Sequence, residues 1–465
     1  MSLAPIIAAN RFGLGARPGE LAAIGGDPQG WLLRQISGSR PAPAEMKGLP
    51  SSAAAFQTFA DALRQRFVPK QDAEGDEAED AAKRREEARR QIAGMYREQV
   101  AARYRFAVRT EESFRERLIH FWTNHFAVSA DKAQVVGLAA TLEYEAVRPH
   151  LAGRFTELLL AVESHPAMIL YLDNQASIGP NSAVARRGKG RVERKLDINE
   201  NLAREVLELH TLGVNGGYTQ ADVTTFAQAL SGWSVGNERG KEPQRAGQFY
   251  FRAAAHEPGA KTVLGKRYTQ AGVEQAQAVL KDLASHPATA THVARKLARH
   301  FIADEPPAAA VERLAKVFRD TDGDLPSLHR ALLESPEAWQ APSRKFKTPH
   351  DFVVSTLRML DFVPERPQQI LSPFQLLGQR PYSPGSPAGW PDTASHWDGP
   401  DALLKRIEWA TAMGERIGSK AQPLALGQQA LGGALAERTR VAIARAESGA
   451  QGLTLLLASP EFQRR

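Results

Sequence analysis

Residues 197–233 are the most informative segment of the chain and read DINENLAREVLELHTLGVNGGYTQADVTTFAQALSGW. Apolar residues recur at helical spacing over 199–212, which predicts an amphipathic helix. The glycines of GVNGG (213–217) predict a left-handed helix stop. Thr219 and Asp222 lie three residues apart and match a capping box at the start of a second helix. The segment therefore predicts two consecutive helices joined by a tight turn.

The composition is that of an ordinary globular protein. Of 465 residues, 43% are hydrophobic and 24% are charged, and this length fits about two or three domains. Lys and Arg number 59 and Asp and Glu 52, which gives a net charge of +7. This mild excess permits acidic partners without requiring a nucleic acid. The absence of cysteine excludes disulfides, thiolate zinc sites, iron–sulfur clusters and a cysteine nucleophile.

Helical periodicity extends over most of the chain. It predicts a mainly α fold in which many helices pack in an orthogonal or bundle-like arrangement. One strand signal interrupts this pattern. QFYFRA (248–253) is aromatic and TVLGKRY (262–268) is β-branched, with the turn residues HEPG (256–259) between them. We expect one small β-hairpin near 248–268.

Three irregular stretches organise the chain. Residues 70–90 form a charged insertion, which we interpret as a long solvated helix or a partly disordered segment. Residues 372–400 are rich in proline and tryptophan and are expected to form an ordered loop over the helices. We expect an N-terminal helical half over 1–245 and a C-terminal half over 246–465, and the two halves could equally form one continuous domain.

The third irregular stretch, residues 175–198, is a Gly- and Ser-rich loop. Its segment 186–195 carries six basic residues and one acid, and its role is left open between a lid over the acidic helix and a plain linker. The loop lacks interleaved aromatic residues, so we expect no sequence-specific binding of nucleic acid.

The helix predicted over 199–212, here called the signature helix, carries the first candidate site. Glu205 and Glu208 share one face with Arg204, and such a carboxylate pair can bind a hard cation or hold a proton for acid/base chemistry. The alternative is a solvated face held together by ion pairs, of which Glu200 and Arg204 have the favourable i,i+4 order. His210 lies on the apolar side, which favours a hydrogen-bonded core residue over a ligand.

Two further segments place polar groups in unusual surroundings. Asn124 and His125 interrupt the aromatic run RLIHFWTNHF (117–126), and burying them is costly unless both find partners. They are therefore either structural residues or site residues, with neither favoured. His256 lies in the expected HEPG turn, where a histidine is well placed to act as a ligand or base.

Several common signatures are absent. The chain holds no P-loop, no GxGxxG, no GxSxG and no HExxH, and the segment TDGDL (321–325) predicts a helix N-cap rather than a calcium loop. No run approaches the roughly 18 apolar residues of a membrane helix, and no signal peptide is visible. We therefore expect no membrane span and a cytoplasmic location by default, or export together with a partner.

Several segments together resemble a known family. They are NRFGLGARP (10–18), FWTNHF (121–126), YLDNQASIGPNS (171–182), NENLAREVLELHTLGVNGGYTQADV (199–223), HPATATHVARKLARHF (286–301), KTPHDFVVSTLRML (347–360) and GQRPYSPGSPAGWPD (378–392). Over nearly its whole length the chain is similar to the bacterial domain of unknown function 1800 family. The resemblance implies no particular reaction and no catalytic residues. It does imply a two-protein system with a sulfatase-like, exported partner.

Two hypotheses of function follow. In the first, Glu205, Glu208 and Arg204 meet Asn124, His125 and His256 in one acid/base or metal-dependent site. A divalent metal would then be held by Glu208, His125 and His256.

In the second hypothesis, the protein is a non-catalytic partner or assembly protein of the sulfatase-like protein. The charged helix and the 372–400 loop, with Trp390 and Trp397, would then form the interface. The sequence leaves the reaction, the substrate, the metal and the oligomeric state open.

Overall fold

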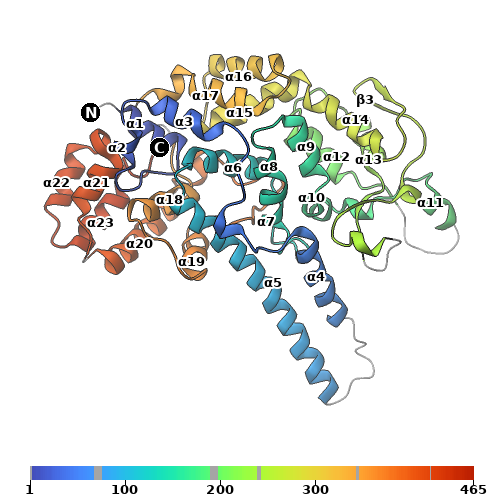
Figure 1. Cartoon of the computed structure of the whole chain (residues 1–465), viewed down its shortest axis with the longest axis horizontal. Coiled ribbons are helices and arrows are strands. Elements are labelled where there is room, and N and C mark those ends of the chain that lie inside the picture. The colour runs from blue at the N-terminus through green and yellow to red at the C-terminus, as the bar shows by residue number, and fades with distance from the viewer. Residues whose placement is uncertain (1–2, 67–75, 189–196, 238–241, 342–344, 419) are drawn as a thin grey trace.

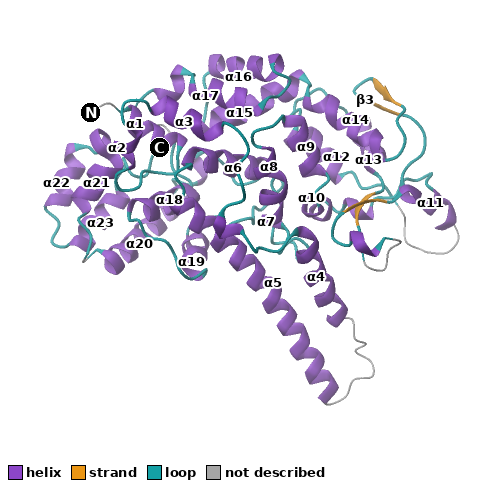
Figure 2. Ribbon diagram, in the orientation of Figure 1, coloured by secondary structure: helices purple, strands orange, loops and turns teal. Residues whose placement is uncertain are grey.

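The protein is a mainly helical molecule, as predicted (Figure 1, Figure 2). The computed structural model describes residues 3–66, 76–188, 197–237, 242–341, 345–418 and 420–465. No helix among these residues is long and apolar enough to cross a membrane.

The helices are short on average and follow one another closely along the chain. The first part of the chain contains α1 (Ala4–Ile7), α2 (Glu20–Ile24), α3 (Pro28–Ile36), α4 (Ser52–Arg66), α5 (Asp76–Arg109), α6 (Ser113–His125), α7 (Ala139–Leu142), α8 (Arg148–His150), α9 (Phe155–Glu163) and α10 (Pro166–Tyr171). The middle part contains α11 (Ala183–Gly188), α12 (Asn201–Glu205), α13 (Gln220–Leu230), α14 (Val273–Ala284), α15 (Pro287–Phe301), α16 (Ala308–Asp320) and α17 (Leu325–Leu333). The last part contains α18 (Pro349–Met359), α19 (Gln368–Leu376), α20 (Pro400–Ile417), α21 (Pro423–Leu431), α22 (Glu437–Ala444) and α23 (Gly449–Ala458).

The helix predicted over 199–212 has an unexpected second half. It begins as α12 and continues as a π-helix, η5 (Val206–His210). Hydrophobic spacing does not distinguish the wider π-turn from an α-turn over so short a stretch, and such turns are frequent at functional sites. The predicted stop and cap are confirmed, because Gly213 has φ +86° and Thr219 and Asp222 form the capping box of α13.

The strands confirm a small hairpin but pair differently from the expectation. β1 (Trp233–Val235) pairs with β2 (Phe249–Phe251), and β3 (Lys261–Val263) pairs with β4 (Lys266–Tyr268), all antiparallel. The hairpin therefore extends over 261–268, that is, TVLGKRY and the lysine before it. Leu264 and Gly265 both have positive φ, which suits a two-residue turn. The HEPG segment is not a hairpin turn, because it joins two separate sheets.

Two hydrophobic cores hold the body together. The larger core takes buried side chains from Ile7 to Ala338. The smaller core combines Leu14, the end of α5 and the segment from Phe352 to Phe462. Tyr382 packs against both cores. Residue 245 lies within the sequence span of the larger core, and a division of the chain there stays a prediction.

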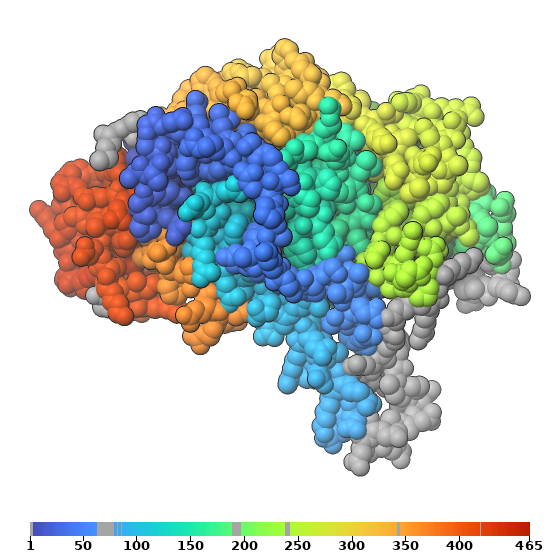
Figure 3. Space-filling view, in the orientation of Figure 1, coloured from blue at the N-terminus to red at the C-terminus, as the bar shows by residue number. Residues whose placement is uncertain are grey.

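Helices α4 and α5 form an arm that projects from the body (Figure 1, Figure 3). The charged insertion predicted at 70–90 lies on it. Residues 67–75 are outside the described part of the chain, and residues 76–90 are helical, since α5 extends over Asp76–Arg109. Exposed charges of both signs cover this part of α5: the acidic ones include Glu79, Asp80, Glu86 and Glu87, and the basic ones include Lys83, Arg84, Arg89 and Arg90.

The other two irregular stretches are partly helical. Helix α19 covers residues 372–376 of the predicted loop and contains Pro373, because burial of Ile370 and Phe374 in the smaller core outweighs the cost of an internal proline. The remaining segment, residues 377–399, is here called the Pro/Trp loop. Of the basic loop, α11 is described and residues 189–196 lie outside the described residues.

Candidate functional site

The two cores meet at a seam that is lined by polar side chains. Helix α6 belongs to the larger core through Phe114, Leu118 and Trp122, which are buried there. Its opposite face carries His120 and Asn124 toward α18 and the Pro/Trp loop. Clefts between packed units are common places for ligand sites, so the seam is the first place to look for function.

Asn124 fastens the Pro/Trp loop across the seam. Its Nδ2 donates to the Trp390 carbonyl at 2.9 Å, and its Oδ1 accepts from the Trp390 amide at 2.8 Å. The neighbouring Gly389 has φ +82°, and a Cβ there would lie 2.4 Å from the Asn124 carbonyl oxygen. The loop is therefore ordered, as predicted, and held by a two-bond clamp.

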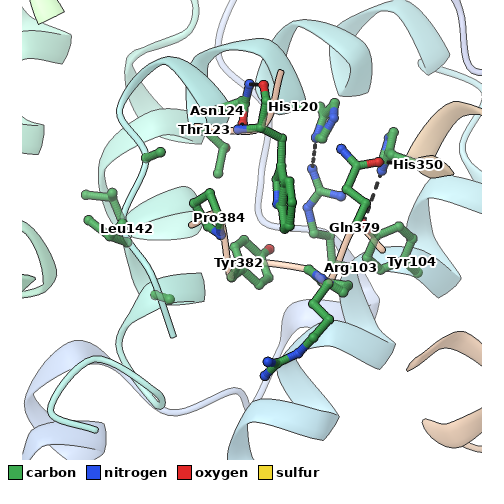
Figure 4. Close-up of a pocket in the computed structure, with 16 residues that line it drawn as sticks. Arg103, Tyr104, His120, Thr123, Asn124, Leu142, His350, Gln379, Tyr382 and Pro384 are labelled. Carbon is green, nitrogen blue, oxygen red and sulfur yellow. Dashed lines mark hydrogen bonds between the residues drawn. The ribbon is translucent and has the colours of Figure 1, made fainter. Parts of the chain in front are cut away.

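A small cavity of about 40 Å³ lies on one side of this clamp (Figure 4). His120 and His350 stack there with ring centroids 3.7 Å apart. Arg103 Nη2 lies 3.2 Å from His120 Nδ1, and the Tyr104 hydroxyl lies 3.1 Å from His350 Nδ1. Since a guanidinium only donates, His120 Nδ1 accepts. Burial, followed by the Arg103 charge, lowers the pKa of His120 well below its ordinary value, so this ring is neutral.

Arg103 is itself anchored in a buried ion network. It donates to Glu143, which also accepts from Arg148 and from the Tyr382 hydroxyl. Burial alone would raise the pKa of Glu143, but Arg103 and Arg148 lower it to about 2. The network makes this wall of the seam rigid.

A larger cavity of about 350 Å³, the His300 cavity, lies on the other side of the clamp. Its polar lining side chains come from α6, α15, the start of α18 and the Pro/Trp loop, and include His120, Asn124, His125, Lys296, Arg299, His300, Thr348, Gln379, Trp390 and Asp392. The volume is at the lower end of the range for small-molecule sites.

His300 and Asp392 form a hydrogen-bonded dyad in this cavity. His300 Nδ1 lies 2.7 Å from Asp392 Oδ2, so the carboxylate favours the tautomer with its proton on Nδ1. His300 Nε2 is buried and has no hydrogen-bond partner in the described part of the chain. Burial lowers the pKa of His300 to about 4, although Asp392 opposes this effect. The ring is therefore a neutral acceptor at pH 7.

Lys296 lies one helical turn before His300 on α15 and lines the same cavity. Its ammonium makes no hydrogen bond or ion pair with any residue that the structure describes. Burial lowers its pKa to about 8, although Asp392 opposes this shift. Among the described residues, the cavity thus combines a cation that has no ion-pair partner with a neutral imidazole whose Nε2 has no hydrogen-bond partner.

The sequence-predicted site residues are divided between places. Asn124 and His125 line the His300 cavity, and His125 Nε2 lies 3.1 Å from the His210 carbonyl oxygen. His210 is a fully buried core residue, as predicted, and its Nδ1 lies 2.7 Å from Glu163 Oε1. His256 lines neither cavity, and its Nδ1 lies 2.9 Å from the Ser231 carbonyl oxygen.

The acidic face of the signature helix lines neither cavity. Arg204 pairs with Glu200 at 3.1 Å, so the predicted ion pair is confirmed. Glu208 accepts from the Tyr218 hydroxyl at 3.3 Å. Burial raises the pKa of Glu205; nearby His210 opposes this effect, and Glu208 adds to it.

The predicted metal site is not assembled. Within the described ranges, no group of three or more His, Asp or Glu side chains could hold a metal ion. Glu208, His125 and His256 therefore do not form a shared ligand set. The physical reason is local: hydrogen bonds tie His125 and His256 to backbone carbonyls, and Glu208 interacts with Tyr218.

Sequence reasoning missed Lys296, His300 and Asp392. His300 follows Lys296 by four residues, a spacing that places both on one helix face, and this was the available signal. Asp392 lies 92 residues from His300, and no local pattern links the two. TDGDL was interpreted correctly, because the Asp324 side chain caps α17.

Comparison with known proteins places the chain in a family. The model of DUF1800, described as a protein of unknown function, matches residues 7–464. The chain belongs to this family. No curated protein and no solved structure matches it.

In this DUF1800 protein, four of the segments that carry the resemblance surround the seam. They are 121–126 on α6, 286–301 on α15, 347–360 on α18 and 378–392 in the Pro/Trp loop. The 171–182 segment instead lies beside HEPG, because Glu257 accepts from both the backbone and side-chain amides of Asn181.

Proposed function

We propose that this DUF1800 protein is an enzyme whose His300 cavity is the substrate site and whose His300 acts as a general base. The observation that carries the proposal is the dyad itself. Asp392 holds Nδ1 at 2.7 Å, Nε2 is buried without a hydrogen-bond partner among the described residues, and His300 lines a cavity of about 350 Å³. A carboxylate that orients an imidazole in this way prepares the other nitrogen to accept a proton.

The reaction class that fits best is water activation, that is, hydrolysis. The neutral His300 can take a proton from a water molecule that attacks a substrate, and Asp392 stabilises the imidazolium that forms. The Asn124 clamp keeps the Pro/Trp loop, and with it Asp392, in place. This proposal retains the acid/base chemistry of the first sequence hypothesis. It places the reacting side chain on α15 instead of on the signature helix.

The test is hydrolysis of a panel of chromogenic 4-nitrophenyl carboxylate, phosphate and sulfate esters. We expect turnover of at least one ester by the wild type and a loss of about 10²–10⁴-fold in His300→Asn, because general-base catalysis contributes that much. Asp392→Asn tests the orientation of the imidazole, and His396→Asn removes an exposed histidine of the same loop as a matched control. No turnover by the wild type, or equal turnover by a folded His300→Asn variant, contradicts the proposal.

A non-catalytic partner function remains the second candidate, favoured by the arm that projects from the body (Figure 3). Of the two tryptophans expected at an interface, Trp397 is 7% exposed and donates to the Pro391 carbonyl, and Trp390 is held by Asn124. The arm is therefore the better docking element for a sulfatase-like protein. Co-purification of that protein with the wild type, and its loss in Arg89→Glu/Arg90→Glu, would support this function.

A further inference from the structure

We propose that the His300 cavity binds the oxyanion group of a small organic acid or ester, and that Lys296 is the cation that receives it. The inference rests on the proposed function in one respect, since it takes the same cavity as the ligand site. It adds the substrate class, namely a molecule that carries a carboxylate, phosphate or sulfate.

The first argument is the charge of the cavity wall. Lys296 and Arg299 face one carboxylate, Asp392. Asp392 already has other cations close by, because Lys345 Nζ lies 3.6 Å and Arg465 Nη2 lies 3.7 Å from its Oδ1. Neither Lys296 nor Arg299 forms an ion pair with a carboxylate in the part of the chain that the structure describes. The wall therefore has an excess of positive charge.

The nearby carboxylates Asp351 and Asp304 do not neutralise this excess positive charge. Asp351 lies between Arg117 at 2.8 Å and Arg465 at 2.7 Å, so its charge is already shared by two guanidinium groups. Asp304 accepts from Lys345 at 2.5 Å. Three carboxylates thus face five cations, namely Arg117, Lys296, Arg299, Lys345 and Arg465. Lys296 and Arg299 are partly buried, and removing a cation from water without a counter-charge is costly, so an anionic ligand would supply that charge.

The second argument is a set of neutral donors in the same cavity. Gln379 is 4% exposed, and its Oε1 accepts from the His350 amide at 2.7 Å, while its NH₂ group makes no hydrogen bond to a described residue. Trp390 Nε1 is buried and also lacks a partner within the described ranges. Both residues lie between the two cavities and line the His300 cavity as well as the small one. Donors around a cation match the several acceptor oxygens of an oxyanion, which forms charge-assisted hydrogen bonds.

The geometry also assigns different roles to Lys296 and His300. Lys296 and His300 are one helical turn apart on α15 and line the same cavity, so an oxyanion at Lys296 would place the rest of a small molecule close to His300. The cavity of about 350 Å³ accommodates a small organic molecule but not a polymer. Lys296 is thus a binding residue, and His300 is the base.

The experiment measures thermal stabilisation by three probes, which are inorganic phosphate, sulfate and acetate, against sodium chloride at equal ionic strength. Ligand binding to the native state raises Tm. We expect at least one oxyanion to raise the wild-type Tm beyond the chloride control. Lys296→Gln should weaken this apparent affinity by about tenfold or more, as expected for loss of a charge-assisted hydrogen bond.

Three variants make the result specific. Arg295→Gln removes a cation from the exposed face of the same helix and should bind like the wild type. Lys296→Arg keeps the charge and should retain most of the binding. Without any ligand, Lys296→Gln should be at least as stable as the wild type, because it removes a partly buried charge that has no ion-pair partner among the described residues.

The outcomes also distinguish the two proposals. Oxyanion binding that depends on Lys296, together with hydrolysis that His300→Asn leaves unchanged, supports the oxyanion site and overturns the general base. If hydrolysis depends on His300 but oxyanion binding does not depend on Lys296, the oxyanion site is overturned and the general base is retained. Absence of oxyanion binding in the wild type, or equal binding by Lys296→Gln, also overturns it.

Discussion

The buried and partly buried charges at the seam differ in whether they have an ion-pair partner. Glu143 is fully paired, since Arg103, Arg148 and the Tyr382 hydroxyl all donate to it. Lys296 makes no such contact with a described residue. Breaking a paired buried ion leaves uncompensated charge, whereas removing an unpaired one relieves it. The paired charges therefore support the structure, and the unpaired charge is available for a ligand.

Glu143→Gln tests this distinction at the level of single residues. We expect the free energy of unfolding to fall by about 3–5 kcal/mol, because two arginines lose their buried counter-charge. Urea unfolding measures the loss. The control is Arg204→Gln, which breaks the partly exposed Glu200 pair and should cost less than about 1 kcal/mol. Equal losses in the two variants would mean that the seam network contributes no more than a surface pair.

Among the elements, the Pro/Trp loop is required for the candidate site in the His300 cavity. It carries Asp392 and Trp390, and the other described residues that line the His300 cavity come from α6, α15 and the start of α18. Asn124 holds the loop by its backbone at Trp390, and Asp304 accepts from the Ala394 amide. Displacing this loop would therefore remove the carboxylate from His300 without touching α15.

The substitution Gly389→Ala should displace the Pro/Trp loop. Gly389 has φ +82°, and an added Cβ would lie 2.4 Å from the Asn124 carbonyl oxygen, so the substitution combines strain and a clash. We expect a loss of about 1–3 kcal/mol in unfolding free energy and faster amide hydrogen exchange at Trp390.

Gly385→Ala is the matched control, because a Cβ at Gly385 meets nothing within 4 Å. It should change neither stability nor exchange at Trp390. Slow exchange in both variants would show that the clamp is not what orders the loop.

For the whole molecule, the buried histidines determine the response to acid. Their pKa values are lowered mainly by burial: to about 4 for His292 and His300, to about 3 for His329, and well below the ordinary value for His120, His125 and His350. In the unfolded chain each titrates near pH 6.5. Between these values the unfolded state binds more protons, so the stability falls as the pH is lowered.

We therefore expect stability to be maximal above pH 6.5 and to decrease from about pH 6.5 toward pH 4. Each proton taken up on unfolding contributes a slope of about 1.4 kcal/mol per pH unit. Urea unfolding at pH 7.5, 6.5, 5.5 and 4.5 measures how the free energy of unfolding depends on pH.

His329→Gln should reduce the slope, and exposed His396→Asn should leave it unchanged. The Glu143 carboxylate, with its pKa lowered to about 2, contributes only below about pH 4.5, so the two effects are separable. A flat stability between pH 7.5 and 5.5 would contradict the burial of neutral histidines.

The sequence alone determined the features that local physics controls. Helical periodicity predicted the mainly α fold, and the Thr219–Asp222 cap, the Asp324 cap, the Glu200–Arg204 pair and the core position of His210 are all confirmed. Each depends on residues within a few positions of one another, or on a side chain's place on a helix face. The family also followed from motifs in order along the chain.

Only the tertiary structure decided what those motifs do together. It paired β2 with β1 instead of β3, turned the end of the signature helix into a π-turn, and left Glu208, His125 and His256 without a shared site. It also brought Asp392 within 2.7 Å of His300 and left Lys296 unpaired among the described residues. These outcomes depend on how two cores and one loop meet across tens to hundreds of residues. The hydrophobic and hydrogen-bonding contacts that fix that meeting are long-range, and no periodicity in the sequence encodes them.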